Sequence, residues 1–524
     1  MDIESALELV GAWGKYQIRN YLLLGIATTV TSVHALINVF HAVVPEFICS
    51  EPGWNISSRD KCTQQVNGSE NRCRSWNYSM EYGENMITEW NLVCQNNYLR
   101  ATAQSIYMTG FLLGAFIFGQ VSDKVGRKKG HLSATILLCI SGTVAAFAPD
   151  YWTFSFARLV VGISTGGTLT IGYVWALEPI GKNYRMPTAM MFEFFFASSC
   201  ALIAGLAFVV KNYWKLQLIT SLAPLVFISY YFLLNESPRW LLGVNKVDEL
   251  VKTFKDISSM NGKQYDDSVL EKLVEYQTLK NSEKDLDKDE KMAEQEVQNS
   301  KNGYERRHYD FRDLFKTPNM RKKTMNICFQ WFTCSFTFYG LSLASSEMKV
   351  SPYVSVTLTG IMDMIGPALA CLVLNRIGRR LSMSISLLFS SIMCFMAIIL
   401  PSRYFIVIIV LAQLGTLGGS SGFAISYMYT AELMPTVVRN VGVGFGSVFA
   451  RIGGLLAPFV AMFSARIALI VFGSCGLLAG SIVLLLPETL GTKLPETLEE
   501  GEEFGKEYIS PCRFLRKRKQ LQSV

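Results

Sequence analysis

The stretch Gly119-Gln-Val-Ser-Asp-Lys-Val-Gly-Arg-Lys-Lys129 stands between two long apolar runs, and its Gly126-Arg127 pair recurs 252 residues later as Gly378-Arg379. The second copy also stands between two long apolar runs. A charged turn that recurs at the same place in two series of apolar segments is typical of membrane proteins built from internal repeats. The stretch therefore predicts a duplicated chain of membrane-spanning helices.

Further features of the sequence recur at nearly the same interval. They pair Glu178 with Glu432, Arg185 with Arg439, Glu236 with Glu488, Gly162 with Gly415, and Gly166 with Gly419, at intervals of 252–254 residues. Chance resemblance would scatter these intervals. We therefore expect two halves of the same architecture, which move against each other around a central site.

Six apolar runs long enough to cross a bilayer precede a charged central stretch, and six more follow it. A hydrocarbon core of roughly 30 Å requires about 20 apolar residues in a helix. The runs lie near residues 21–44, 99–121, 131–149, 152–176, 188–210, 216–234, 323–345, 352–374, 382–400, 404–427, 441–463 and 466–486. The pattern predicts an all-α polytopic membrane protein with twelve transmembrane helices in two six-helix halves.

Composition supports this fold class, since 50% of the 524 residues are hydrophobic and 17% are charged. A soluble protein would carry roughly a quarter charged residues, and a large soluble all-α protein would show amphipathic surface helices, which occur almost entirely within 245–320. The predicted segments are a cytosolic N-terminus 1–20, an N-terminal half 21–234 with an outer loop 45–98, a cytosolic central loop 235–322, a C-terminal half 323–486 and a basic cytosolic tail 487–524.

Two independent signals predict the orientation. Basic residues crowd 124–129 and 513–519, and the positive-inside rule places such clusters in the cytosol. Both termini are then cytosolic, and 45–98 lies outside.

This loop carries glycosylation sequons at Asn55, Asn67 and Asn77. It also carries an even set of cysteines, which suits disulfides in an oxidising compartment and permits three pairings: Cys49, Cys62, Cys73 and Cys94.

The spacing of 119–129 resembles the loop signature of the major facilitator superfamily. Three further stretches resemble cytosolic motifs of its organic ion transporter family. They are Glu178 to Arg185, Asn235-Glu-Ser-Pro-Arg-Trp-Leu241 and Glu432-Leu-Met-Pro-Thr-Val-Val-Arg-Asn-Val-Gly442. That family groups organic cation, carnitine and organic anion carriers. The resemblance implies the major facilitator fold, transport by alternating access and a plasma-membrane location.

The charged motifs predict an ion-pair network that closes the cytosolic gate and breaks when the gate opens. Gly119 would permit close helix contact, and Asp123 would pair with Arg127 or approach a helix N-terminus of the other half. Alternatively these are static surface pairs, each worth roughly 0–1 kcal/mol. The candidate gating residues are Gly119, Asp123, Gly126, Arg127, Arg158, Glu178, Arg185, Glu236, Arg239, Glu432 and Arg439.

Charges inside the predicted spans point to the substrate. A charged side chain at a helix centre costs roughly 2.5–3.5 kcal/mol on insertion scales, so each should face a partner or a wet cavity. Arg451 falls where organic cation members of the family carry aspartate and where anion and carnitine members carry arginine. Asp363 falls where the family usually carries glutamate. Arg451 would clamp a carboxylate and Asp363 would hold an ammonium group, which suits a zwitterion such as a betaine. The alternative is an Asp363–Arg451 ion pair that binds nothing.

Further candidates lie on the first and seventh runs. Trp331, Phe338 and Tyr339 would offer aromatic faces to a cation, or simply pack. His34 and Asn38 share one helix face and would line the cavity, or His34 would bond within the bundle. Arg158 lies in Phe156-Ala-Arg-Leu-Val-Val-Gly162, which resembles the superfamily's fourth-span motif, and this resemblance implies a structural or coupling role. Glu193 either faces the cavity or reaches the membrane interface.

The expected function is alternating-access transport of small organic ions, with uptake of an organic cation or a carnitine-like zwitterion and with a sodium ion or proton as the coupling ion. The sequence shows no nucleotide-binding loop, metal-ligand cluster or catalytic triad, so we predict neither an enzyme nor a cofactor. The net charge of +7 sits in membrane-flanking loops, which argues against nucleic acid as a partner. Alternatives are an organic anion exchanger, a non-transporting membrane sensor and a sugar porter.

Overall fold

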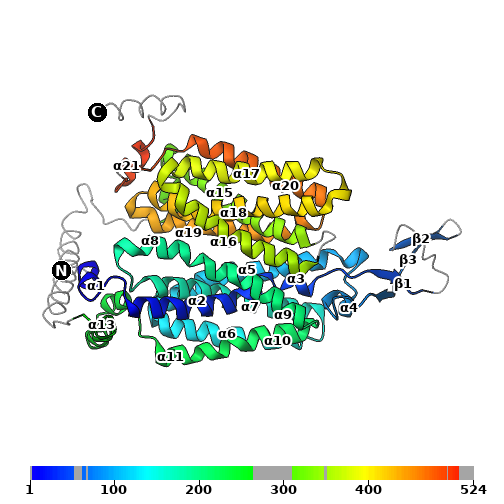
Figure 1. Cartoon of the computed structure of the whole chain (residues 1–524), viewed down its shortest axis with the longest axis horizontal. Coiled ribbons are helices and arrows are strands. Elements are labelled where there is room, and N and C mark those ends of the chain that lie inside the picture. The colour runs from blue at the N-terminus through cyan, green and yellow to red at the C-terminus, as the bar shows by residue number, and fades with distance from the viewer. Residues whose placement is uncertain are drawn as a thin grey trace, which may run out of the picture.

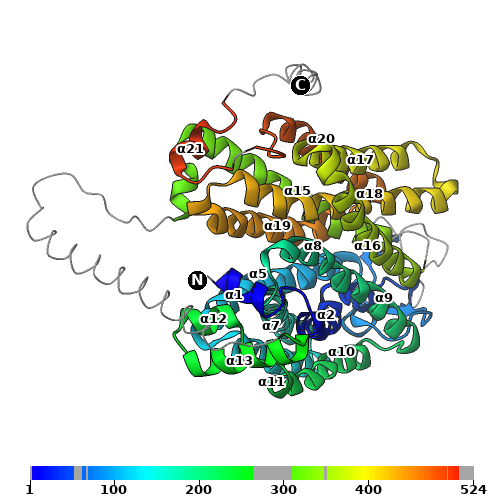
Figure 2. The ribbon, with the colours of Figure 1, turned by 60° about the vertical axis from the view of Figure 1, so that its left-hand side comes forward.

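A computed structural model describes residues 3–51, 62–66, 69–263, 310–346, 351–492 and 494–506. Long helices run along the longest axis in two layers, and the N-terminal half of the chain forms one layer and the C-terminal half the other (Figure 1). Figure 2 shows the same two bundles stacked on each other from another side. We call the boundary between the two bundles the seam.

The N-terminal bundle is built from α2 to α11, with a short helix α1 (Ile3–Leu9) at one end. Its helices are α2 (Lys15–Leu36), α3 (Asn38–His41), α5 (Tyr98–Val125), α6 (Arg127–Ala146), α7 (Tyr151–Leu177), α8 (Lys182–Met191), α9 (Glu193–Val209), α10 (Tyr213–Leu222) and α11 (Tyr230–Leu233). A 3₁₀ segment, Ala223–Ser229, joins α10 to α11.

The C-terminal bundle repeats this plan. Its helices are α15 (Pro318–Ser346), α16 (Pro352–Ile377), α17 (Arg379–Ile399), α18 (Phe405–Leu433), α19 (Arg439–Ala461) and α20 (Ala465–Ile482).

Eleven helical segments of the described residues are long and apolar enough to cross a bilayer. The predicted helical, multi-pass membrane architecture is therefore confirmed, with eleven qualifying spans where the sequence predicted twelve. The expected seventh span, α15, has 29 residues but falls short in apolar character. It packs against α16, α18, α19 and α20. A helix surrounded by protein tolerates polar side chains that a lipid-facing helix does not, and Thr333, Ser335 and Thr337 on α15 are almost completely buried.

Small residues bring α5 and α7 into close contact. A β-carbon on Gly162 would lie 2.2 Å from the carbonyl oxygen of Tyr107, and one on Gly166 would lie 2.3 Å from that of Phe111. These glycines allow the two backbones to approach each other, as small residues do in membrane helices. The α5–α7 pair is thus a rigid unit that fixes the position of the aromatic residues on α5.

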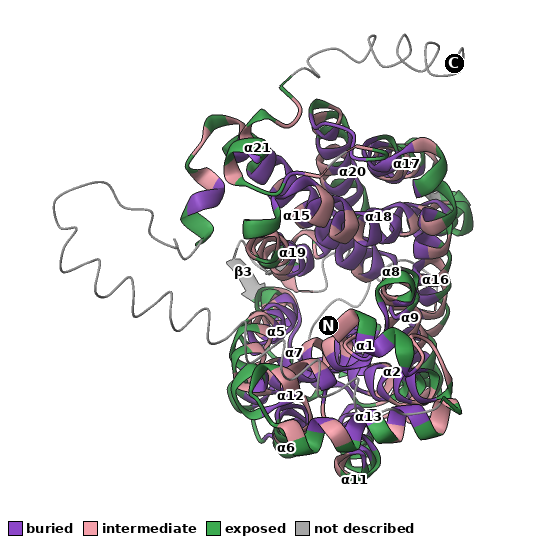
Figure 3. Cartoon of the chain, turned by 90° about the vertical axis from the view of Figure 1, so that its left-hand side faces the viewer, coloured by how far each residue is buried: buried purple, intermediate pink, exposed green. Residues whose placement is uncertain are grey.

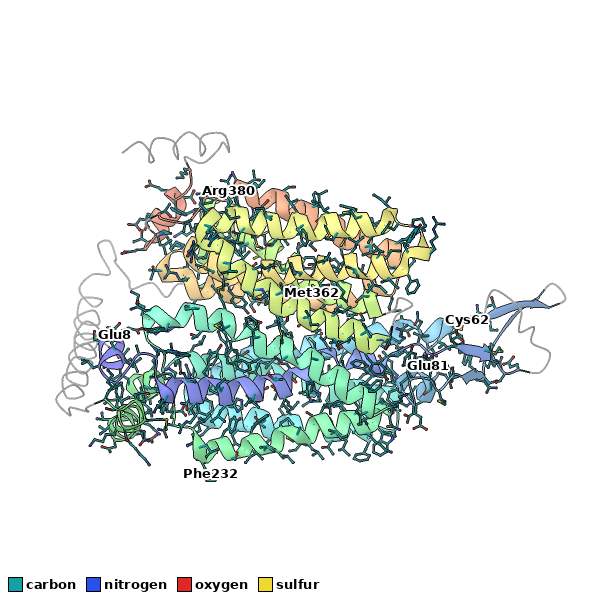
Figure 4. The ribbon with its side chains drawn as sticks, in the orientation of Figure 1. Glu8, Cys62, Glu81, Phe232, Met362 and Arg380 are labelled. Atoms are coloured by element: carbon teal, nitrogen blue, oxygen red, sulfur yellow. A yellow bond between two sulfur atoms is a disulfide. The ribbon has the colours of Figure 1, made fainter. Side chains whose placement is uncertain are left out.

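One end of the molecule, which we call the loop end, carries the segment between α3 and α5. Two short antiparallel pairs form there: β1 (Phe47–Cys49) with β4 (Trp76–Tyr78), and β2 (Thr63–Val66) with β3 (Ser69–Arg72). The helix α4 (Met86–Trp90) follows them. The disulfides Cys49–Cys73 and Cys62–Cys94 resolve the pairing that the sequence left open. Figure 4 labels Cys62 at this end.

The opposite end, which we call the tail end, carries α1, α12 (Pro238–Gly243), α13 (Val247–Asn261) and α21 (Leu498–Glu503). Figure 3 views the molecule from this end. Side chains of α1, α12 and α13 pack into one hydrophobic cluster. Its completely buried members include Leu7, Leu241, Phe254 and Ile257. The helix α21 docks on the start of α15, where the Glu502 carboxylate accepts the backbone N–H of Asn319.

Packing along the seam differs between the two ends. At the loop end, one hydrophobic cluster joins both bundles and includes Phe40 and Phe111 with Phe336 and Ala457. Towards the tail end, each bundle has a large cluster of its own, and Met190 on α8 is the N-terminal side chain that packs against the C-terminal cluster. The two bundles are therefore held together mainly at the loop end.

Candidate functional site

Arg127 is the centre of a charged cluster at the tail end of the N-terminal bundle. Its Nη2 and Nε donate to the two carboxylate oxygens of Glu178 at 2.9 and 3.1 Å. Its backbone N–H donates to Glu236 Oε1 at 2.9 Å. Gly126, which ends α5, has φ +104°, and a β-carbon there would lie 2.3 Å from Glu236 Oε2. Glycine at this position is therefore required by both the backbone angle and the approach of the carboxylate.

The C-terminal bundle contains the same cluster around Arg379. Its Nε and Nη2 donate to the Glu432 carboxylate at 2.9 and 3.0 Å, and its backbone N–H donates to Glu488 Oε1 at 2.8 Å. Gly378 has φ +94° and also faces the Glu488 carboxylate. Figure 4 labels the neighbouring Arg380 at this end. The recurring arginine and its two glutamates therefore make the same contacts in both bundles.

Glu4 on α1 adds a counter-ion to the N-terminal cluster. Its Oε1 accepts from Arg239 Nη2 at 2.8 Å and from Arg185 Nη2 at 3.0 Å. Burial alone would raise the pKa of Glu4, but hydrogen bonds and charge from the two guanidinium groups outweigh it and lower the pKa below its ordinary value. Burial raises the pKa of Glu236, against the effect of the backbone N–H groups that it accepts. Sequence reasoning missed Glu4, because a lone acidic residue near a terminus carries no pattern.

Arg439, which corresponds to Arg185, has weaker contacts. Its Nη2 donates to the Thr436 hydroxyl at 3.2 Å, and its Nε is buried without a hydrogen-bond partner. In the described part of the chain, the ion pairs join residues of one bundle and none crosses the seam. The clusters are thus separate charged faces at the tail end.

Two of the proposed gating residues lie in exposed surroundings. Gly119 faces open space, because no heavy atom lies within 4 Å of the place where its β-carbon would be. The close helix contact expected at Gly119 is therefore absent from this structure. Asp123 pairs with Arg127 at 2.6 Å, and its side chain is 70% exposed. It does not contact a helix of the other bundle through any ion pair between described residues.

Charged side chains lie at mid-helix where the bundles meet. Asp363 on α16 is buried and accepts a short hydrogen bond from the Ser420 hydroxyl. Figure 4 places the neighbouring Met362 at the middle of the molecule. The Arg451 guanidinium on α19 lies 4.2 Å from the ring centre of Phe111 on α5. The alternative of an Asp363–Arg451 ion pair is therefore wrong for this structure, in which each of the two has a different partner.

Glu193 faces the same part of the seam from α9. It interacts electrostatically with both Arg451 and Asp363. Tyr173 from the N-terminal bundle and Tyr427 from the C-terminal bundle also interact with it. Four of these side chains are partly exposed to solvent, namely Glu193, Tyr173, Tyr427 and Arg451. These side chains therefore bring charges and phenol groups from both bundles to the same part of the seam.

The aromatic candidates on α15 have different surroundings. Trp331 is completely buried and donates its Nε1–H to the Thr430 hydroxyl at 2.9 Å. Phe338 and Tyr339 form an edge-on pair with ring centres 5.1 Å apart, and Tyr339 interacts electrostatically with Arg451. The structure thus brings Tyr339 to the charged part of the seam.

Arg158 and His34 meet inside the N-terminal bundle. Arg158 Nη2 donates to the backbone carbonyl of His34 at 3.1 Å, and its guanidinium carbon lies 4.4 Å from the ring centre of Tyr107. All three residues are completely buried.

A cavity of about 210 Å³ occupies the seam at the loop end. The N-terminal bundle contributes Asn38, Arg100 and Gln104 to its wall, whereas the C-terminal bundle contributes apolar residues. Beside it, the ring of Tyr353 on α16 lies 5.5 Å from the rings of both Phe40 and Phe208. These aromatic contacts close the loop end of the seam.

Among the described residues, no group of three or more histidine, cysteine, aspartate or glutamate side chains could hold a metal ion. Asn77 is exposed on β4, whereas Asn55 and Asn67 lie outside the described residues.

Comparisons with known proteins agree on one family. The sequence matches the sugar (and other) transporter family over residues 53–500. It is 34% identical to an organic cation transporter protein of Drosophila melanogaster, over 97% of this chain and 95% of that protein. It is 30% identical to organic cation/carnitine transporter 4 of Arabidopsis thaliana, over 93% and 88%, and to solute carrier family 22 member 6-B of Xenopus laevis, over 96% and 95%.

Solved structures show the same fold. The inward-open conformation of the xylose transporter XylE from E. coli matches with a TM-score of 0.63 at 15% identity, over 93% of this chain and 99% of that one.

Proposed function

This chain belongs to the sugar (and other) transporter family of the major facilitator superfamily, within its organic cation, carnitine and organic anion carriers, and from that premise we propose that it moves small organic cations or zwitterions across the plasma membrane by alternating access. Two of the three relatives named above carry organic cation in their names, and one of these also carries carnitine. The choice among ions rests on the charges at the seam.

The observation that carries the proposal is the set of three charges where the two bundles meet. Glu193 and Asp363 supply two carboxylates, and Arg451 supplies one guanidinium. They lie on α9, α16 and α19, of which α16 packs against α9 and α19 packs against α5. A site with this balance attracts an ammonium group, and Arg451 can still orient a carboxylate. A carnitine-like solute, with one group of each kind, fits this arrangement.

The packing of the seam supports alternating access. Tyr353 and its aromatic neighbours close the loop end, where Ser105 Oγ also donates to the Leu455 carbonyl across the seam at 2.7 Å. At the tail end, the charged clusters stay within their own bundles. We take the tail end as cytosolic, as the positive-inside rule predicts. This conformation would then open the site to the cytosol.

The driving force depends on the net charge that crosses the membrane. At about 100 mV, one positive charge gains roughly 2.3 kcal/mol, equal to an accumulation of about 40-fold. A simple cation needs no other coupling for uptake. A zwitterion has no net charge, so its concentrative uptake requires a co-ion such as sodium or a proton.

The test is uptake of radiolabelled carnitine, tetraethylammonium and p-aminohippurate by cells that express the chain, with Arg451→Asp beside the wild type. We expect carnitine uptake by the wild type and a shift toward tetraethylammonium in the variant. Arg466→Asp, at an exposed arginine at the start of α20, is the matched control and should leave the preference unchanged. Tetraethylammonium uptake that is equal in the wild type and Arg451→Asp would contradict the role given to Arg451.

A second candidate, exchange of organic anions, is favoured by one observation. Arg451 lies over the Phe111 ring and forms no ion pair with a described carboxylate, so it is available to an anion. Uptake of p-aminohippurate that rises when cells are preloaded with an unlabelled dicarboxylate would support exchange. Uptake of any of these solutes by the purified protein in liposomes would exclude a sensor without transport activity, and glucose in the same assay tests the sugar-porter alternative.

A further inference from the structure

The most anomalous charge in the described part of the chain is Arg158. Its side chain is completely buried at mid-helix in α7, and it makes one hydrogen bond, to the His34 carbonyl. Its Nε and Nη1 have no hydrogen-bond partner, and no described carboxylate pairs with it. A buried, unpaired guanidinium is among the most costly groups in a membrane protein, so its retention requires a compensating ligand or a function.

The groups around Arg158 have a common chemical character. Its electrostatic neighbours are Tyr107, His34 and His41, which are neutral or basic. Both ring nitrogens of His41 are buried without a hydrogen-bond partner, and its ring lies against Phe154 and Tyr213. A cation would be repelled here. Water would supply hydrogen bonds but would leave the positive charge uncompensated.

The loop-end cavity reaches to within one helical turn of this cluster. Asn38 and Gln104, which line the cavity, stand one helical turn from His34 and Tyr107 respectively. The side-chain amide oxygens of both Asn38 and Gln104 are buried without a partner. Two polar side chains with unpaired acceptor oxygens therefore stand between the cavity and the buried cluster in the sequence of α2–α3 and α5.

We propose that a small inorganic anion with the size and charge of chloride binds beside Arg158, between α2, α5 and α7, and enters through the loop-end cavity. The guanidinium donates Nε–H and Nη1–H to the anion, and the hydroxyl of Tyr107, whose ring centre lies 4.4 Å from the guanidinium carbon, is a further donor. The anion removes the net charge from the interior of the N-terminal bundle.

This site is electrostatically coupled to the charged part of the seam through two aromatic residues of α5. Tyr107 and Phe111 lie one helical turn apart, with ring centres separated by 6.3 Å. Arg158 covers the first ring and Arg451 covers the second. Tyr107 interacts electrostatically with both arginines. An anion at Arg158 therefore lowers the positive potential that Arg451 experiences, and we expect it to affect which substrates bind at the seam.

The test measures thermal unfolding of the purified full-length protein in detergent, in sodium chloride and in sodium gluconate of equal ionic strength. A ligand that binds the folded state raises the midpoint, so chloride should raise it by about 2 °C relative to gluconate. Bromide should act like chloride. A midpoint that is the same in all three salts would overturn the proposal, because water alone would then satisfy the site.

Two variants locate the effect. Tyr107→Phe keeps the ring and removes a donor, so the chloride concentration for half-maximal stabilisation should rise about five- to tenfold. Arg158→Gln, if it folds, should lose the chloride effect. Arg451→Gln is the matched control, since it removes the other guanidinium on this aromatic pair and should retain the effect. Loss of the effect in Arg451→Gln with retention in Tyr107→Phe would place the anion at the seam and contradict the proposal. The outcome does not depend on transport, so it is independent of the proposed substrate.

Discussion

The two bundles contain the same arginine–carboxylate cluster, but the N-terminal copy has more counter-charge. Arg127 has Glu178 and Asp123 as paired carboxylates, whereas Arg379 has Glu432 and the neutral Asn375. Arg185 is held by Glu4, whereas its counterpart Arg439 meets only a threonine hydroxyl among the described residues. This difference suggests that the N-terminal cluster is a permanent assembly and that the C-terminal one changes partners during transport.

The largest expected effect is a difference between equivalent substitutions in the two clusters. Glu432→Gln leaves the mostly buried Arg379 guanidinium without a paired carboxylate, which should lower the free energy of unfolding by about 3–5 kcal/mol. Glu178→Gln should cost only about 1–2 kcal/mol, because Arg127 keeps Asp123 at 2.6 Å. Thermal and denaturant unfolding of the purified variants gives both values.

Asn375→Asp is the control for this prediction, since it places in the C-terminal cluster the carboxylate that the N-terminal cluster has at the same position. In the Glu432→Gln background, it should recover part of the lost stability. Equal losses for Glu178→Gln and Glu432→Gln, with no recovery by Asn375→Asp, would show that the extra carboxylate does not distinguish the clusters.

A smaller effect is expected at Glu4. Glu4→Gln removes the counter-ion shared by Arg185 and Arg239, and should cost about 1–2 kcal/mol of stability. Because the folded-state pKa of Glu4 lies below its unfolded value, the contribution is complete above the unfolded pKa and is lost as the pH falls through the folded pKa. The protection factors of the α1 backbone amides, which correct for the slower intrinsic exchange at low pH, should therefore fall on acidification in the wild type.

The matched comparison for Glu4 is Glu8→Gln, on the same helix but exposed and outside these ion pairs. It should leave the exchange of α1 unchanged. If the wild type and Glu4→Gln show the same acid-dependent exchange, α1 is held by its buried Leu7 and not by the charge of Glu4.

Repetition made much of this architecture predictable. Arg127, Glu178 and Glu236 recur at nearly the same spacing, and residues that contact each other in one half are expected to do so in the other if the fold is repeated. The run lengths predicted the spans for a similar physical reason, since bilayer thickness fixes helix length. The exception in apolar character is α15, which other helices surround.

Contacts that depend on single, unrepeated residues could not be predicted. Glu4 has no counterpart in the second half, and Phe111 lies in an apolar run without any signal that it faces Arg451. Ser420 is one of many serines in the spans, so its hydrogen bond to Asp363 follows only from the packing of α16 on α18. Gly119 illustrates the opposite error, because the general preference for small residues at membrane helix contacts predicted a contact that this conformation lacks.

The smallest effect on stability, and the sharpest test of the comparison, is expected at Arg439. Arg439→Gln should change the free energy of unfolding by less than about 0.5 kcal/mol, because the side chain gives up only a hydrogen bond to Thr436. Arg185→Gln, which loses Glu4, should be clearly more destabilising. If Arg439 finds a carboxylate when the tail end closes, Arg439→Gln should still slow uptake severalfold at unchanged surface expression. A variant with wild-type stability and wild-type uptake would mean that Arg439 is a surface residue in every conformation, and that the weaker counter-charge of the C-terminal cluster has no role in the transport cycle.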